Sequence, residues 1–538
     1  MNVSFDPLYY PYPSQRNVTI ARNGMVATSQ PLAAEAGLHM LKKGGNAVDA
    51  AIATAIALTV LEPTSNGIGS DAFAICWIDG EIYGINGSGP APQSLTADGL
   101  KKLGYDEMPT HGKIPVTVPG APSTWYKLSE RFGKLPFEAL FEPAIEYAEK
   151  GFPISPTLGF YWDLAFKKYN KILKDNIYKH WFKTFAPNGK APKIGDIWQS
   201  KGHANTLKEI AETKAESFYR GALAEKTASF FKTHDGYLSK EDLANYEAEW
   251  VDPIKVNYRG FDVWEIPPNG QGMITLMALN ILKGFDFPEK EHVDTYHKQI
   301  EAMKLAFSDG LQFITQEDNM PYTVEELLSE KYAAERRELI GNGALEPKPG
   351  QPKGSGTVYL ATADKDGNMV SFIQSNYMGF GSGIVIPETG IAMQNRGHTF
   401  SLNPNDVNYL EPGKKTYHTI IPGFLTKGNE PVGPFGVMGG FMQPQGHLQV
   451  VMNTVDFHLN PQSALDAPRW QWVKDKRIDV DPSFPQPIAE ALQRKGHQIV
   501  RTLNHGVFGR GQIIWRDPKT GVLYGGTEHR TDGHIASW

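Results

Sequence analysis

The sequence predicts a mixed α/β fold, on three observations. Strand and helix patterns alternate up to about residue 90. Residues from about 120 to 340 form mainly amphipathic helical patterns separated by Pro and Gly, and short β-rich strings dominate after residue 356. A chain of 538 residues exceeds what one small core requires. We therefore expect either two to four domains or one large interleaved core, without an internal repeat of fixed period.

Two helices and two strands are predicted near the start. A strand at residues 25–28 precedes a helix from about 31 to 43, which Ser29 or Gln30 can cap. A second helix follows Asn46, in the apolar stretch 47–61. This stretch is too short and too Ala-rich to span a bilayer, so we interpret it as a buried core helix. Strands at 72–78 and 81–85, joined by Asp79-Gly80, form a hairpin, and one more strand is predicted at 261–266.

The clearest boundary lies before Thr357. Residues 341–356 are rich in Pro, Gly and Lys, which is typical of a linker. The strings 357–363 and 369–375 then read as a hairpin whose turn is Asp364-Lys365-Asp366-Gly367-Asn368. Further strands are predicted at 390–393, 419–425 and 434–437. A linker is accessible and locally unstable, so this boundary is a natural cleavage point.

Composition and charge exclude several classes of function. Apolar residues make up 41% and charged residues 21% of the chain, as in soluble globular proteins. The net charge of −6, without a Lys/Arg stripe, argues against nucleic-acid and membrane partners. The single cysteine, Cys76, allows neither an intrachain disulfide nor a cysteine metal cluster, and we interpret it as a buried, inert thiol. The first seven residues do not resemble a signal peptide, so we expect a cytoplasmic protein.

No metal, cofactor or catalytic serine is indicated. The fifteen histidines are scattered without an H-E-x-x-H string, and a surface loop explains His529 and His534. Neither a Walker loop nor a full dinucleotide fingerprint is present. A serine hydrolase would need a G-x-S-x-G elbow, and residues 379–383 have the wrong register for one. We predict that the protein holds neither metal nor cofactor.

Thr357 suggests a different nucleophile. A threonine hydroxyl needs a nearby base to take its proton. Cleavage before Thr357 would give that residue its own α-amino group, with a pKa of roughly 7.7 to 8.0, so base and nucleophile would share one residue. The small residues Gly354-Ser355-Gly356 would let the backbone bend for attack on the preceding carbonyl. Taken alone, a threonine after a glycine is more simply a strand start.

A set of motifs in fixed order resembles a known family. The motifs are Gly44-Gly45-Asn46-Ala47-Val48-Asp49-Ala50, Glu62-Pro63 with Gly67-Ile68-Gly69, the hairpin from Thr357, Phe380-Gly381-Ser382-Gly383-Ile384, Gly439-Gly440 and Ala467-Pro468-Arg469. From about residue 20 to the end, the chain resembles the γ-glutamyltransferases. It looks most similar to their glutathione hydrolase-like branch, near oxamate amidohydrolases and cephalosporin (glutaryl) acylases.

The resemblance implies a fold and a maturation step. The family has the four-layer αββα fold of N-terminal-nucleophile hydrolases. The resemblance implies a precursor that cuts itself between Gly356 and Thr357. The products are a large subunit, 1–356, and a small subunit, 357–538, which together form one interleaved unit. The implied partner is a small-molecule amide substrate. The oligomeric state stays open, with a homodimer as one option.

The resemblance also implies catalytic roles. Thr357 matches the nucleophile, and Ser375 matches the hydroxyl residue that hydrogen-bonds it. Gly439 and Gly440 match the glycine pair whose backbone N–H groups form the oxyanion hole. The expected reaction passes through an acyl-enzyme, which water or a second amine resolves. A non-catalytic binding protein of the same fold is the alternative of a different class, and the intact motifs argue against it.

The substrate pocket departs from the family pattern. Ser88 replaces the arginine that holds the glutamate α-carboxylate, Thr399 replaces the carboxylate that holds the α-amino group, and Arg396 stands where Gln is common. His418-Thr419 replaces the usual paired serines. The predicted substrate-binding residues are Arg396, Thr399, Tyr377, His418, Thr419 and Ser88.

These departures suggest a changed acyl specificity. Without an acid at residue 399, the pocket should repel an ammonium group, whereas Arg396 can bind a carboxylate bidentately. We expect amides of γ-glutamyl-like or other carboxylate-bearing acyl groups, with oxamate and glutaryl (cephalosporin) specificities as alternatives. The structural alternatives are that Arg396 pairs with a structural Asp or Glu and that His418 makes only a structural hydrogen bond. The short stretch 403–412 is expected to leave the pocket open to bulky leaving groups.

Overall fold

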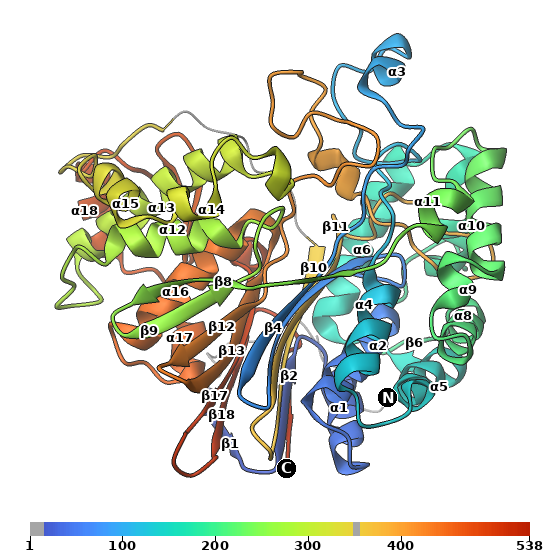
Figure 1. The fold of residues 1–538 in the computed structure, drawn as a ribbon, viewed down its shortest axis with the longest axis horizontal. Helices are drawn as coiled ribbons and strands as arrows, with labels where there is room; N and C mark the ends of the chain where they lie inside the picture. Colours follow the sequence, from blue (N-terminus) through green and yellow to red (C-terminus); the bar gives the residue numbers. More distant parts are fainter. Residues whose placement is uncertain (1–15, 348–355) are drawn as a thin grey trace.

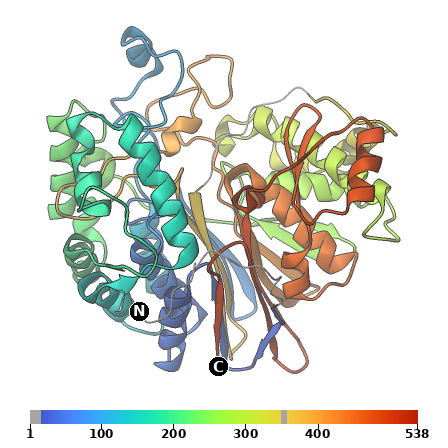
Figure 2. The same ribbon diagram turned by 180° about the vertical axis from the view of Figure 1, so that it is seen from behind.

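The chain forms four layers, with two sheets packed face to face and helices on both outer faces (Figure 1). The computed structural model describes residues 16–347 and 356–538. Each main sheet has seven strands, and every pairing within the two sheets is antiparallel. The view from behind shows the same order of helix, sheet, sheet and helix (Figure 2). The predicted αββα architecture is thus confirmed.

The first sheet carries the predicted hairpin after the linker. Its strands, in spatial order, are β19 (His534–Ser537), β2 (Gly24–Thr28), β10 (Gly356–Asp364), β11 (Met369–Tyr377), β3 (Asp71–Ile78), β4 (Glu81–Gly87) and β7 (Glu249–Val251). The helices beside it are α1 (Pro31–Lys42), α2 (Ala47–Leu61), α4 (Ala121–Phe132), α5 (Glu142–Lys150), α6 (Pro156–Ile172), α7 (Lys179–Phe185), α8 (Lys201–Glu212), α9 (Glu216–Tyr219), α10 (Ala222–Thr233) and α11 (Lys240–Ala244), while α3 (Ala97–Lys102) projects from the top of Figure 1.

The second sheet combines strands from both ends of the chain. In order they are β1 (Thr19–Ala21), β18 (Leu523–Thr527), β17 (Arg510–Arg516), β13 (Glu430–Met438), β12 (Gly423–Lys427), β9 (Phe261–Glu265) and β8 (Ile254–Tyr258). Its helices are α12 (Gly272–Leu282), α13 (Val293–Phe313), α14 (Val324–Leu327), α15 (Glu330–Arg337), α16 (Gln443–Val455), α17 (Pro461–Asp466) and α18 (Gln486–Arg494). Two small sheets are formed by β14 (Trp470–Lys474), β15 (Arg477–Val480) and β16 (Gln498–Arg501), and by β5 (Phe152–Pro153) and β6 (Ile197–Trp198).

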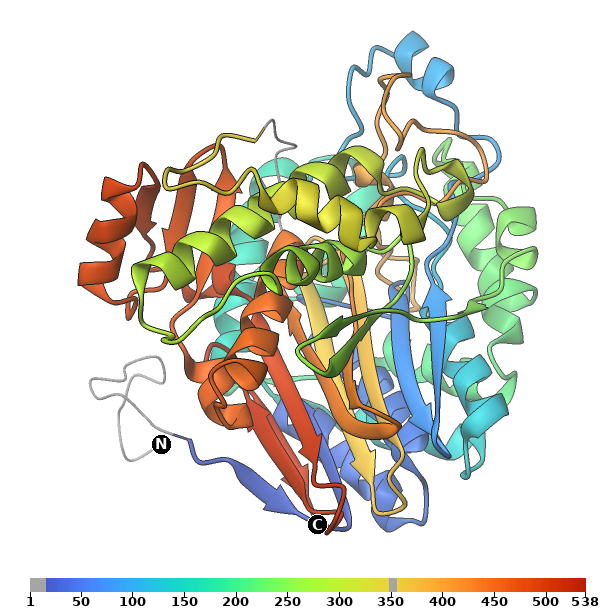
Figure 3. The same cartoon turned by 60° about the vertical axis from the view of Figure 1, so that its left-hand side comes forward.

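The two halves of the chain interleave in both main sheets. The β10–β11 hairpin lies between β2 and β3 of the N-terminal half, and in Figure 3 the green β8 and β9 extend a sheet of orange and red strands. Residues 1–356 and 357–538 therefore share both sheets. Their separation into two subunits stays a prediction.

The first two helices follow their sequence signals. The Gln30 side chain accepts a hydrogen bond from the Ala33 N–H, and Asn46 forms a capping box with Asp49 at the start of α2. All fifteen residues of α2 are buried, because the helix is apolar on every side. Cys76 in β3 is buried as predicted, and burial raises the pKa of its thiol to about 12, which keeps it unreactive. Across the described ranges, none of the helices has the length and apolarity needed for a membrane span.

Some strand predictions need correction. Residues 390–393 are not a strand, since their pairing is limited to isolated bridges such as Val385 with Ala392. The strand expected at 419–425 begins only at Gly423, because residues before it form a loop around the site. Strands β7 and β8 were not predicted, because pairing with β4 and β9 fixes them rather than a strong local pattern.

Alternation along β10 sets the position of Thr357. Tyr359 and Ala361 lie in the apolar cluster between the sheets, whereas Val358 and Leu360 belong to the cluster beneath the helices. Because side chains alternate with a period of two, Thr357 belongs to the face between the sheets. The facing strand β13 supplies Met438 to the same cluster. Thr357 therefore lies where the two sheets meet.

A close approach of the sheets depends on Gly436 in β13. A Cβ added there would overlap the ring of Tyr359. We expect Gly436→Ala to lower the free energy of unfolding by about 1–3 kcal/mol, as overpacking of a dense core typically does. Urea denaturation checks this against Gly343→Ala, where the nearest contact to an added Cβ is 3.8 Å. Equal stability of the two variants would contradict the packing argument.

Candidate active site

Thr357 and Ser375 are in hydrogen-bonding contact. Thr357 lies in β10 with 1% of its surface exposed, and its Oγ1 is 3.0 Å from the Oγ of Ser375 in β11. The register of the β10–β11 pair shifts at this point, between Gly356 and Val358. Tyr377 has a φ of 75°, and its backbone N–H donates to Ser375 Oγ over 2.8 Å. Two adjacent strands thus hold the two hydroxyl groups together in a buried position.

The predicted glycine pair lies at the end of the facing strand. Gly439 follows β13 with φ 145°, a conformation that favours glycine, and Gly440 (φ 60°) opens the 3-10 turn η5 (Gly440–Met442), which leads into α16. The Gly440 carbonyl accepts a hydrogen bond from Gln271 Nε2 (2.8 Å). The same amide donates to the Thr419 carbonyl (2.6 Å). Gln271, which the sequence analysis did not single out, therefore joins the glycine segment to the predicted substrate pocket.

Arg396 is a buried cation with unused donors. It begins the 3-10 turn η4 (Arg396–Thr399) and has 1% of its surface exposed. Its guanidinium lies 4.4 Å from the centroid of the Tyr377 ring, and Nη1 donates to Thr419 Oγ1 (2.8 Å). Within residues 16–347 and 356–538, Nε and Nη2 have no hydrogen-bond partner. Burial lowers the pKa of Arg396 to about 10, so the group stays charged at neutral pH and can bind an anion.

A carboxylate that the sequence analysis missed lies beside Arg396. Asp71 begins β3, is fully buried and pairs in register with Ser375. Its Oδ2 lies 3.9 Å from Arg396 Nε, and its Oδ1 has no hydrogen-bond partner in the described part of the chain. Burial raises the pKa of Asp71 to about 7, although Arg396 and, more weakly, the backbone N–H of Gly120 act in the opposite direction. An acid therefore lies beside Arg396 although residue 399 is a threonine, so repulsion of an ammonium group does not follow from Thr399 alone.

His418 fixes the other side of Asp71. Its Nε2 is 2.9 Å from Asp71 Oδ2, and its Nδ1 accepts the Ile420 N–H over 3.3 Å, so the proton belongs on Nε2. Burial, with Arg396 nearby, holds the pKa of His418 well below its ordinary value. The imidazole is thus a neutral donor to Asp71, which is the structural hydrogen bond considered above.

Thr399 and Ser88 use their hydroxyl groups within the protein. Thr399 Oγ1 donates toward the carbonyl oxygens of Arg396 (2.8 Å) and Tyr417 (2.9 Å), which closes the η4 turn. Ser88 Oγ donates to Asn86 Oδ1 (2.7 Å) and lies 3.3 Å from Asn269. Ser88 is thereby part of a hydrogen-bonded network with the side-chain amides of Asn86 and Asn269.

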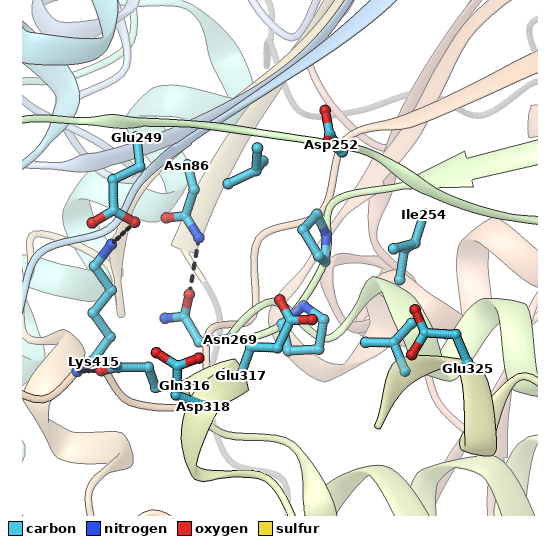
Figure 4. A pocket seen from close by; sticks show the side chains of 14 residues that line it. Asn86, Glu249, Asp252, Ile254, Asn269, Gln316, Glu317, Asp318, Glu325 and Lys415 are labelled. Atoms are coloured by element: carbon cyan, nitrogen blue, oxygen red, sulfur yellow. Dashed lines mark hydrogen bonds and ion pairs between the residues drawn. The ribbon is translucent and has the colours of Figure 1, made fainter. Parts of the chain in front are cut away.

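An open, acidic cavity of about 560 Å³ lies beyond this amide network (Figure 4). Asn86 and Asn269, joined by a hydrogen bond of 3.0 Å, form part of its wall. Its charged lining residues are Glu249, Asp252, Glu317, Asp318, Glu325 and Lys415. Lys415 forms an ion pair with Glu249 (2.6 Å) at one side of it (Figure 4). The lining contains neither Thr357 nor Arg396, so this cavity is separate from the pair of hydroxyl groups.

Among the residues that the structure describes, one group of side chains could bind a metal. His297, Glu301 and His497 are buried, with ligand atoms within 4.8 Å of one another. The two rings already share a hydrogen bond of 2.8 Å, and His297 Nε2 bonds the Gly341 carbonyl. The Lys304 ammonium lies 2.8 Å from the Glu301 carboxylate. A cation beside this ammonium would be repelled, so the group is better explained as a hydrogen-bonded network that holds the start of the 341–356 segment.

These features define first a class and then a family. A buried threonine where two facing sheets meet, with helices outside both, is the arrangement of an N-terminal-nucleophile hydrolase, and solved structures of this class share the fold. The profile described as Gamma-glutamyltranspeptidase matches residues 33–538. The chain therefore belongs to the gamma-glutamyltranspeptidase family, and it is an enzyme of hydrolase type.

Three relatives show where the chain stands in that family. It is 35% identical over 527 residues to the glutathione hydrolase-like YwrD proenzyme of Bacillus subtilis (strain 168), which covers 96% of this chain and 98% of that protein. It is 29% identical to the oxamate amidohydrolase proenzyme of Klebsiella pneumoniae, with 96% and 99% covered. The crystal structure of a cephalosporin acylase from Bacillus halodurans matches with a TM-score of 0.97 at 65% identity, and covers 100% of this chain and 99% of that one.

Proposed function

We propose that the protein is a self-processing amidase with Thr357 as its nucleophile. The Thr357 hydroxyl attacks the Gly356 carbonyl, and the resulting ester is hydrolysed to give two subunits. The freed α-amine of Thr357 then takes the hydroxyl proton as the oxygen attacks a substrate amide. The amine product leaves with that proton, and water releases the acid from the acyl-enzyme. The contact of Thr357 with Ser375 and the proenzyme relatives support this proposal.

The acyl group is proposed to carry a carboxylate. The observation behind this is the buried Arg396 guanidinium, whose Nε and Nη2 lack partners among the described residues. Such donors are costly to leave unpaired, and a ligand carboxylate would satisfy both. A glutaryl-type group has the required chemistry, and the name of the 65% identical cephalosporin acylase agrees with an acylase role. We further propose a cytoplasmic enzyme made of subunits 1–356 and 357–538.

A γ-glutamyl donor is the second candidate. Asp71, with its free Oδ1 beside Arg396, could hold an α-ammonium group while Arg396 holds the α-carboxylate. Both candidates need Arg396, and they differ in what Asp71 binds.

Replacement of Arg396 by glutamine is expected to remove the preference for carboxylate-bearing acyl groups. A charged hydrogen bond contributes about 1.5–3 kcal/mol, so the preference for glutaryl- over pentanoyl-p-nitroanilide should fall roughly 10- to 100-fold. The ratio of the two kcat/KM values, measured on processed enzyme, checks this.

Arg336→Gln serves as the matched control. Arg336 is a partly buried arginine paired with Asp309 (2.7 Å) in another part of the protein, so its loss should leave the ratio unchanged. A wild-type enzyme that does not distinguish the two acyl groups, or an Arg396→Gln variant with the full preference, would refute the carboxylate pocket.

A further inference from the structure

Asp71 has a free oxygen atom at the point where an acyl group would meet Arg396. We propose that Asp71 and Arg396 form one acyl-recognition subsite, in which Asp71 takes up a proton when the acyl group brings a carboxylate without an ammonium group. This inference rests on the proposed function, and it makes Asp71 the residue that determines specificity for acyl charge.

The geometry supplies both halves of such a subsite. Arg396 offers Nε and Nη2, and Asp71 offers Oδ1, all three buried and without partners among the residues that the structure describes. Their other atoms are fixed: Arg396 Nη1 by Thr419 Oγ1 (2.8 Å), and Asp71 Oδ2 by His418 Nε2 (2.9 Å). The register pairing of Asp71 with Ser375 places this carboxyl group on β3, next to the strand of Ser375 and two strands from Thr357. Because paired residues share a face, the free atoms lie on the same face of the sheet as the two hydroxyl groups.

Charge balance requires a proton. Arg396 and Asp71 together are neutral when both are ionised. A zwitterionic γ-glutamyl group keeps that balance, because its ammonium can pair with Asp71. A glutaryl group adds a second buried carboxylate against one guanidinium, which is strongly unfavourable unless one acid is protonated. Protonated Asp71 would then donate its Oδ1–H to the ligand carboxylate.

No neighbouring group replaces Asp71 in this role. The charged and titratable groups around it are Arg396, His418, Lys415, Tyr219 and Tyr246. His418 is held neutral by burial, and burial raises the pKa values of both tyrosines, so they stay protonated. Lys415 is paired with Glu249. Burial raises the pKa of Asp71 itself to about 7, which places its protonation within reach of neutral pH.

The sign of the pH dependence follows. A bound carboxylate favours protonated Asp71. The affinity for the glutaryl group is therefore highest at pH values below the pKa of Asp71 and decreases progressively at higher pH. The preference for glutaryl- over pentanoyl-p-nitroanilide should be constant at low pH and fall by about tenfold per pH unit above pH 7. Titration of the Thr357 amine affects both substrates equally and cancels in this ratio.

Asp71→Asn tests the proposal. Asparagine keeps the shape and is neutral at all pH values, so the ratio should stay at its low-pH value from pH 6 to 9, and any γ-glutamyl activity should be lost. The control Asp309→Asn removes another buried aspartate, in α13, and should keep the wild-type fall. A flat wild-type ratio, or an unchanged fall in Asp71→Asn, overturns the role of Asp71.

A second measurement compares processed wild-type enzyme with Asp71→Asn. Calorimetric binding of glutarate at pH 8, in buffers of different ionisation enthalpy, should show uptake of about one proton per site more in the wild type than in the variant, so that any uptake by the Thr357 amine cancels. Equal proton uptake in the two proteins refutes the inference. Failure of the proposed function gives a different result: the preference for glutaryl- over pentanoyl-p-nitroanilide would then be the same in wild type and Arg396→Gln at every pH. An Arg396-dependent preference that is flat with pH would refute only the role of Asp71.

Discussion

Thr357→Ala should leave the chain as one polypeptide without amidase activity. The side chain removed is the only group proposed to attack either the Gly356 carbonyl or the substrate. Loss of a nucleophile in a comparable hydrolase lowers kcat by about 10⁶-fold, so activity should fall below detection. A denaturing gel of the wild type should show two fragments, of 356 and 182 residues (538 − 356), and the variant should show one band. N-terminal sequencing of the smaller fragment should begin at Thr357.

Two further variants separate chemistry from folding. Thr357→Ser keeps a hydroxyl group and should still be cut, although its rate will differ. Thr362→Ala removes a buried threonine from the same strand but from the opposite face, where its Oγ1 bonds the Ala47 carbonyl (2.7 Å). This variant should be less stable yet fully processed. An unbroken, fully active wild-type chain, or turnover retained in Thr357→Ala, would show that the nucleophile assignment is wrong.

Much of the fold follows from local signals in the sequence. The β10–β11 hairpin was predictable because two β-rich strings flank Asp364–Asn368, where Asp364 Oδ1 accepts the Asp366 and Asn368 N–H groups. The helices α1 and α2 were predictable from their caps and apolar faces. The three-residue strand β7 was not, because it is specified by pairing of Trp250 with Ile85 across the sheet edge. The sequence of a short segment without alternating apolar residues does not by itself predict a strand.

The candidate site also has one part that the sequence predicts and one part that it does not. Thr357 and Ser375 lie on one hairpin, so motif order and strand alternation suffice to bring them together. Asp71 and His418 are 347 positions apart, and they meet only because the loop that contains His418, which is bridged to Gly270, reaches the start of β3 in the folded protein. One signal was present: Asp71 is a charged residue at the start of an otherwise apolar strand. A buried acid of that kind needs a partner, but the partner's identity depends on tertiary structure.

The second large effect is expected from Gly439→Ala. Gly439 adopts φ 145°, where an L side chain is strained, and an added Cβ would lie 3.0 Å from the Gly509 Cα. The backbone would have to rotate, and the N–H groups proposed to bind the oxyanion would turn away. Removal of one oxyanion donor costs on the order of 10²–10³ in kcat. Steady-state kinetics on processed enzyme should show this fall in kcat with a smaller change in KM.

The control for this variant must place an alanine at another positive-φ glycine, away from the site. Gly428, in the exposed turn between β12 and β13, has φ 59° and open space around an added Cβ. Gly428→Ala should lower the midpoint of thermal unfolding through strain alone and leave kcat unchanged. If both variants lose stability and only Gly439→Ala loses kcat, the effect belongs to the oxyanion site. If kcat falls equally in both variants, strain or general instability accounts for the loss. If kcat falls in neither, Gly439 does not contribute to stabilisation of the transition state.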